Sequence, residues 1–147
     1  MYPYVLFLHI LSATVWTGGH LVLALAILPR AIRQRSTVML QQFEGWYEPL
    51  GLPAFGIQII TGLWLAWHYI PDVKAWISFN SPFARLIACK LFLVLLSLIL
   101  AVDARLRIIP SLSLKTLPAL AWHIVAITCL AILFVALGVA FRVGGFF

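Results

Sequence analysis

The sequence predicts an all-α integral membrane protein, a four-helix bundle with a short interfacial amphipathic helix between its first and second spans. Of the 147 residues, 64% are hydrophobic and 10% are charged, whereas soluble domains are about 45–50% apolar and about 25% charged. A span takes roughly 20 apolar residues, so this length accommodates about four spans and little else. The composition also excludes a disordered chain, because disordered chains are polar and poor in aromatic residues.

Four apolar segments have the length of a membrane span, at about 4–28, 52–69, 83–101 and 117–141. We expect the first to end at Pro29, because proline interrupts a helix, and Arg30 marks a membrane interface. The second ends before Pro71, and the third begins after Pro82. We find no internal repeat and no linker, so residues 1–147 are expected to form a single transmembrane domain.

The connection at 34–49 mixes polar residues with Trp46, Tyr47 and other apolar residues. This pattern is typical of a helix that lies along the membrane interface. The connection at 71–82 carries Trp76 and is also expected to rest in the interface.

The net charge of +6 indicates topology and contact with anionic lipid headgroups, not nucleic-acid binding. Most basic residues fall in the connections on one side of the membrane: Arg30, Arg33, Arg35, Arg105, Arg107 and Lys115. The connection on the other side carries only Lys74, with Arg85 and Arg142 near helix ends. Because positive loops stay cytoplasmic, we expect both termini on the outer side.

All four histidines lie within the predicted spans: His9, His20, His68 and His123. Ionisable residues in a bilayer are costly and therefore indicate function, although any single histidine could simply pack and form hydrogen bonds. His9 and His20 are 11 residues apart, which is three turns plus about 20° and roughly 16 Å along a helix. The first span therefore presents two histidines on one face, at two depths.

Antiparallel spans place His68 near the depth of His9 and His123 near the depth of His20. Paired imidazoles from facing helices are what axial ligation of haem b requires, so the sequence predicts one or two haems, with Trp16 beside them. In a square bundle both pairs cannot lie on the diagonal that a haem prefers. One pair could therefore bind copper instead, since imidazole suits both metals.

Lys90 is the other charge placed within a span, near the depth of His9. It could bind a haem propionate or another anionic group, or extend its side chain to the outer interface. The four acidic residues all fall in predicted loops or at helix ends, so we expect no acidic relay inside the membrane: Glu44, Glu48, Asp72 and Asp103. Cys89 and Cys129 form no CxxC pair, which excludes covalent haem attachment and a thiolate zinc site.

Several short motifs resemble those of two membrane protein families. The first span carries His9-x6-Trp16-x-Gly18-Gly19 and ends in Leu28-Pro29-Arg30, which resembles the opening helix of CopD-like proteins and is similar to that of HemJ-type protoporphyrinogen oxidases. The second span carries Thr61-Gly62-Leu63-Trp64, which resembles a CopD-like element. The third carries Ala88-Cys89-Lys90-Leu91, which resembles the start of the third helix in both families.

The two resemblances imply different functions. CopD-like proteins imply copper handling in the bacterial inner membrane. HemJ-type proteins imply haem binding and oxidation of protoporphyrinogen IX, with His9 and Lys90 among the important positions. This chain departs from the HemJ pattern after the third span, which no histidine closes.

Taken together, the histidines first favour a multi-pass b-type haem protein that transfers electrons across or within the bacterial inner membrane. The alternatives are a copper-binding or copper-transporting protein and a porphyrinogen or quinol oxidase. The expected partners are the lipid bilayer and a redox protein or quinone, without nucleic acid. Catalytic residues and the presence of a homo-oligomer stay open.

Overall fold

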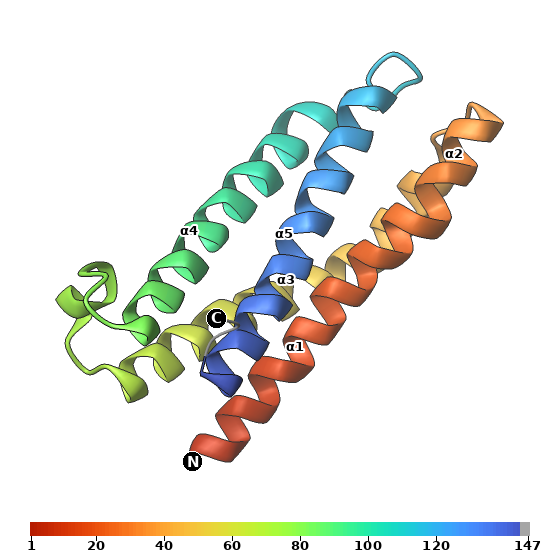
Figure 1. Ribbon diagram of the computed structural model, residues 1–147. Coiled ribbons are helices and arrows are strands. Elements are labelled where there is room, and N and C mark those ends of the chain that lie inside the picture. Colours follow the sequence, from red (N-terminus) through yellow and green to blue (C-terminus); the bar gives the residue numbers. More distant parts are fainter. Residues whose placement is uncertain (145–147) are drawn as a thin grey trace.

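The computed structural model describes residues 1–144 and confirms the all-α membrane class (Figure 1). Four helical rods are long and apolar enough to cross a membrane: Tyr2–Gln34, Val38–Tyr69, Pro82–Ile108 and Leu117–Val143. Successive rods run in opposite directions (Figure 1). Large apolar side chains on their outer faces are exposed, including Leu25, Ile60 and Leu106 at 70–74%, as a surface that faces lipid requires.

The first rod continues through Pro29, where the sequence predicted its end. It consists of α1 (Tyr2–Val22), a π-helical turn η1 (Leu23–Ile27) and α2 (Leu28–Gln34). At the end of the π-turn the Leu28 N–H donates to the Leu23 carbonyl. This hydrogen bond spans five residues instead of the four of an α-helix, so the helix is wider just before the proline. This local widening accommodates the proline ring and its missing N–H. The rod ends at Arg35, whose φ of 48° is left-handed.

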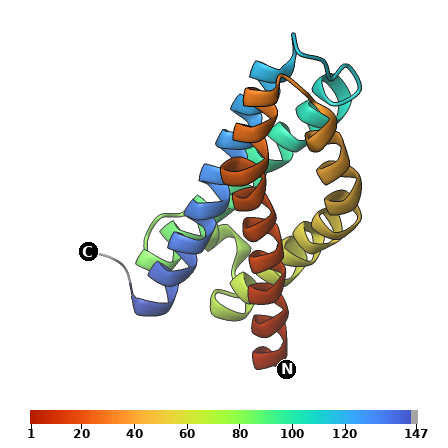
Figure 2. The ribbon, with the colours of Figure 1, turned by 90° about the vertical axis from the view of Figure 1, so that its right-hand side faces the viewer.

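The second rod, α3 (Val38–Tyr69), is one continuous helix of 32 residues. The segment expected as a separate interfacial helix is therefore its first part, and that expectation was wrong. Pro49 and Pro53 lie inside α3, and Figure 2 shows the helix curving along its length. Each proline removes one backbone hydrogen bond, which a membrane helix tolerates where neighbouring helices support it. Residues 38–49 thus belong to the bundle.

A 3-10 turn, η2 (Val73–Ile77), connects α3 to α4 (Pro82–Asp103). Trp76 is buried in this turn, where its Nε1 donates to the Ile70 carbonyl at 2.8 Å. The α4 helix begins at Ser81, whose hydroxyl accepts from the Ala84 N–H at 3.1 Å. It passes into a second π-turn, η3 (Ala104–Ile108), and the chain returns as α5 (Leu117–Val143).

The buried core has two parts along the bundle. One lies towards the α2–α3 connection and contains Leu28, Ala31, Leu40, Ile108, Leu117, Leu120 and Ile124. The other lies near the middle and contains Trp16, Phe55, Ile127 and Ala131. The Trp16 and Phe55 rings stack there, with centroids 4.3 Å apart.

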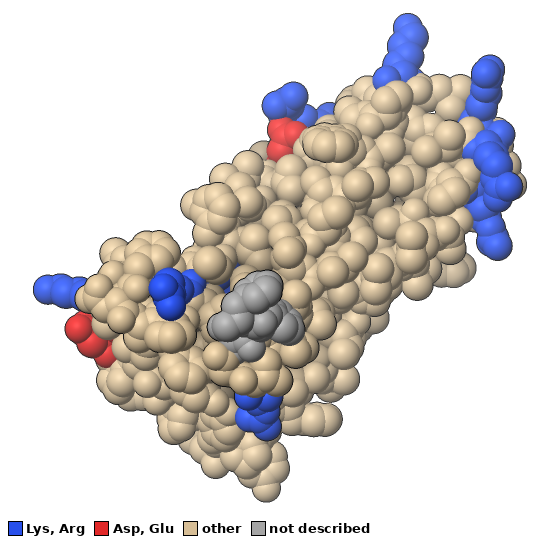
Figure 3. All heavy atoms as spheres, viewed as in Figure 1, with Lys and Arg blue, Asp and Glu red and all other residues tan. Residues whose placement is uncertain are grey.

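Basic side chains project from the end of the bundle that carries the α2–α3 and α4–α5 connections (Figure 3). Arg30, Arg33, Arg35 and Lys115 are all exposed. This basic end is the one that the sequence predicted to be cytoplasmic, and both π-turns belong to the same half of the molecule.

Candidate functional site

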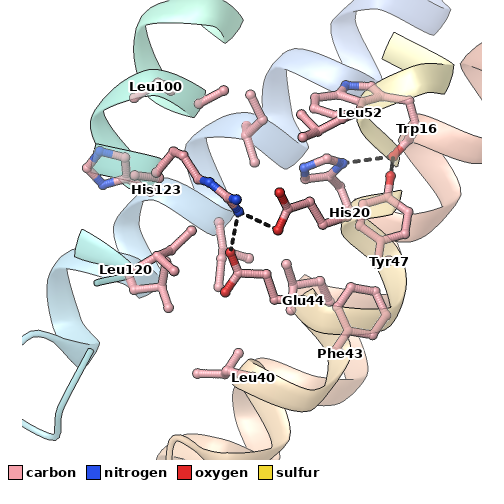
Figure 4. Close-up of a pocket in the computed structure, with 18 residues that line it drawn as sticks. Trp16, His20, Leu40, Phe43, Glu44, Tyr47, Leu52, Leu100, Leu120 and His123 are labelled. Atoms are coloured by element: carbon pink, nitrogen blue, oxygen red, sulfur yellow. Dashed lines mark hydrogen bonds and ion pairs between the residues drawn. The ribbon is translucent and has the colours of Figure 1, made fainter. Parts of the chain in front are cut away.

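A cavity of about 190 Å³ lies between α1, α3, α5 and the end of α4. Residues of both core clusters contribute to its wall, which is mainly apolar. Its polar lining residues are His20, Glu44, Tyr47, Glu48, Arg105 and His123. Figure 4 shows His20 and His123 on opposite sides of this space, with Glu44 between them.

His20 is buried, with 7% of its surface exposed. Its Nδ1 lies 2.8 Å from the Trp16 carbonyl. A carbonyl only accepts hydrogen bonds, so Nδ1 carries the proton and Nε2 keeps its lone pair. Within residues 1–144 that Nε2 has no hydrogen-bond partner. A carbonyl that fixes the tautomer in this way is the usual outer-shell partner of a metal-ligating histidine.

Tyr47 holds the backbone that carries His20. Its hydroxyl donates to the carbonyls of Val15 at 3.2 Å and Trp16 at 3.0 Å. A Cβ atom at Gly19 would overlap the Tyr47 ring, and one at Gly51 would lie 2.7 Å from its Cε1. The ring therefore fits between two glycines, one on α1 and one on α3. This contact explains why residue 19, the second of the Gly18-Gly19 pair, has no side chain.

Glu44 and Glu48 lie one turn apart on α3 and face Arg105 of η3. The Arg105 Nη1 forms an ion pair with the Glu48 carboxylate and lies 3.8 Å from Glu44 Oε1. Both carboxylate side chains are 27% exposed, so they are partly buried and belong to a helix, not to a solvated loop. Two carboxylates thus face one guanidinium in this part of the cavity.

His123 also lines the cavity, but both of its ring nitrogens have partners. Nδ1 lies 3.0 Å from the Ala119 carbonyl, and Nε2 lies 2.9 Å from Asp103 Oδ2. Both ring nitrogens are therefore engaged by protein groups. The other Asp103 oxygen pairs with Arg107 at 2.9 Å. The structure therefore brings His20 and His123 to one cavity, with only His20 free to offer a lone pair.

His9 and His68 are not brought together. His9 Nδ1 lies 2.9 Å from the Thr61 hydroxyl, which itself donates to the Ile57 carbonyl at 2.6 Å. His68 is seven residues past Thr61, which is about 10 Å further along the helix. It is exposed and stacks on Trp64, with ring centroids 5.2 Å apart and planes 6° from parallel. His9 therefore faces Thr61, which lies two helical turns before His68 on α3. The predicted pair would need α3 to be shifted by those two turns against α1.

The remaining two predicted residues have separate surroundings. Trp16 is buried in the cavity wall, with its ring centroid 4.2 Å from that of His20. Lys90 lies far from this cavity along α4, and its Nζ is 5.3 Å from the centroid of the Phe141 ring, a distance that allows a cation–π contact.

The residues present do not fit a bis-histidine haem. His123 Nε2 is bound to Asp103, and His9 faces Thr61 instead of His68. In the described part of the chain, no three His, Cys, Asp or Glu residues are grouped as a preformed metal site.

Sequence reasoning missed Glu44, Glu48 and Arg105, because it assigned them to an interfacial helix and a solvated helix end. The structure instead places both carboxylates within the helix α3, where they line the cavity. One signal was present: Glu44 and Glu48 are four residues apart, which puts both carboxylates on one helix face.

Comparison with known proteins identifies the family. Residues 41–141 match the family model described as CopD, copper resistance protein D. No curated protein and no solved structure gives a match. The matched region contains the acidic pair, Arg105 and His123, while His20 precedes it. Because the match covers more than half of the chain, this four-span membrane protein belongs to the CopD family.

Proposed function

We propose that this chain binds a copper ion inside the membrane as cargo, in the cavity between α1, α3, α5 and the end of α4. The observation that carries the proposal is His20, a buried imidazole whose Nε2 has no partner among residues 1–144 and whose cavity also contains two carboxylates. The name of the family, copper resistance protein D, supports copper as the ion. The histidines alone favour haem first, but the contacts of His9 and His123 and the family favour the copper alternative.

The ligand types favour Cu(II) over Cu(I). Thiolates and thioethers select Cu(I), whereas imidazole and carboxylate suit Cu(II). The chain has two methionines and two cysteines, and none of the four lines the cavity. The available donors are the nitrogen of His20 and the oxygens of Glu44 and Glu48.

Titration of the purified protein in lipid nanodiscs with Cu(II) tests this proposal. We expect one bound ion per chain, with an electron paramagnetic resonance spectrum that shows coupling to one imidazole nitrogen. Zn(II) should bind more weakly, as the general order of divalent affinities requires. A preparation that binds no copper, and instead carries stoichiometric haem with Soret and α bands, would contradict it.

We also propose a bacterial inner-membrane location with the basic end cytoplasmic and both termini outside. Single cysteines at Asn80 and Ser113, both exposed positions, leave the charge distribution unchanged when placed in a Cys89→Ala, Cys129→Ala background. In intact spheroplasts, an impermeant maleimide should label Asn80→Cys, while Ser113→Cys should react only after permeabilisation. The opposite pattern would show that the chain has the inverse orientation.

A further inference from the structure

The carboxylates of the proposed copper site already hold a cation. Arg105 pairs with Glu48 and lies 3.8 Å from Glu44, and all three residues line the cavity with His20. A metal ion and a guanidinium cannot occupy the same carboxylate oxygens. An ion that binds the carboxylate oxygens next to Arg105, together with His20, therefore competes with Arg105.

The charges favour such an exchange for a divalent ion. By formal charge one guanidinium compensates only one of the two carboxylates, so the site favours a further cation. A divalent ion that replaces the guanidinium compensates the formal charge of both carboxylates. A monovalent ion compensates only one of them, as Arg105 does. The outgoing Arg105 can move to the surface of the bundle, because its side chain is already 54% exposed.

The position of Arg105 links this exchange to the structure of the inner end. It belongs to the π-turn η3 and follows Asp103, the partner of His123, by two residues. The α4 end thus binds α3 through Arg105 and α5 through Asp103. Release of Arg105 removes the ion pair between α4 and α3 while the link to α5 can stay in place.

We propose that Arg105 is a tethered counter-cation, which a divalent metal ion displaces from Glu44 and Glu48 when it binds beside His20. This inference rests on the proposed copper site and adds a selectivity device to it. A monovalent cation cannot complete the exchange without leaving an uncompensated carboxylate. Arg105 therefore lowers the intrinsic affinity of the site and favours divalent over monovalent ions.

The test measures Cu(II) affinity of the wild-type chain, Arg105→Gln and Arg105→Lys in nanodiscs, with Arg107→Gln as the matched control. Arg107 lies on the same turn but pairs with Asp103. Loss of the competing guanidinium should tighten Cu(II) binding at least tenfold in Arg105→Gln and less in Arg105→Lys. Arg107→Gln should stay within twofold of wild type. Added methylguanidinium should weaken Cu(II) binding to Arg105→Gln again.

A second measurement uses the wild-type chain and avoids any folding defect of the variants. Phenylglyoxal should modify Arg105 faster with Cu(II) present than without it, relative to Arg107, as read by mass spectrometry. Copper binding with no change in Arg105 reactivity, or with equal affinity in Arg105→Gln, would overturn the exchange and leave the copper site standing. Absence of copper binding in both wild type and Arg105→Gln would overturn the site itself.

Discussion

Replacing His20 with alanine should weaken Cu(II) binding by more than a hundredfold and remove the nitrogen coupling from the spectrum. His20 supplies the buried imidazole of the cavity whose Nε2 is free, and the remaining carboxylates are already paired with Arg105. His68→Ala is the matched control, because that ring is exposed and stacks on Trp64. Isothermal titration of both variants against wild type gives the comparison.

The fold should survive this change. The Trp16 carbonyl that accepts from His20 also accepts from Tyr47 at 3.0 Å, so it keeps one hydrogen bond. Loss of the other costs about 0.5–1.5 kcal/mol, and the unfolding midpoint in detergent should fall only slightly. Unchanged copper affinity in a folded His20→Ala protein would place the ion elsewhere.

Gly19→Ala should destabilise the protein strongly, whereas Gly18→Ala should not. A Cβ at Gly19 overlaps the Tyr47 ring, while one at Gly18 meets nothing within 4 Å. Tyr47 cannot simply turn away, because Gly51 confines its other side and its hydroxyl holds two α1 carbonyls. Overpacking costs about 1–3 kcal/mol, and each lost hydrogen bond about 0.5–1.5 kcal/mol more.

Gly18→Ala should be neutral or slightly stabilising, because alanine is favoured over glycine in a helix by up to about 1 kcal/mol. The unfolding midpoints of the two variants, measured under the same detergent conditions, should therefore shift in different directions or by clearly different amounts. Equal shifts would mean that the fit of Tyr47 between Gly19 and Gly51 does not hold α1 against α3.

The class of fold could be predicted because it depends on composition and segment length alone. The helix boundaries could not, because they depend on how the backbone accommodates proline. Pro29 is tolerated through a π-turn, and Pro49 and Pro53 are tolerated by curvature of α3. Neither response is encoded in a hydrophobic pattern, so a proline near the end of a span suggested a break where the helix continues.

The site was partly predictable for a related reason. Depth along antiparallel helices placed His20 and His123 near one another, and the structure brings both to one cavity. The same reasoning failed for His9 and His68, because the register of α1 against α3 is set by side-chain contacts such as that of Tyr47 with Gly19. The acidic pair was missed since charged residues near a predicted interface are usually solvated.

The length of α3 has a consequence for the lipid around the protein. Its 32 residues reach about 48 Å, whereas the hydrocarbon core is about 30 Å thick. A core of that thickness takes about 20 helical residues, so part of α3 extends beyond the hydrocarbon unless the helix tilts. A thicker bilayer would surround more of α3 with hydrocarbon, including the part that carries Glu44 and Glu48, and would strengthen their attachment to Arg105. Metal affinity should therefore depend on acyl-chain length, which would make the bilayer itself part of the ion site.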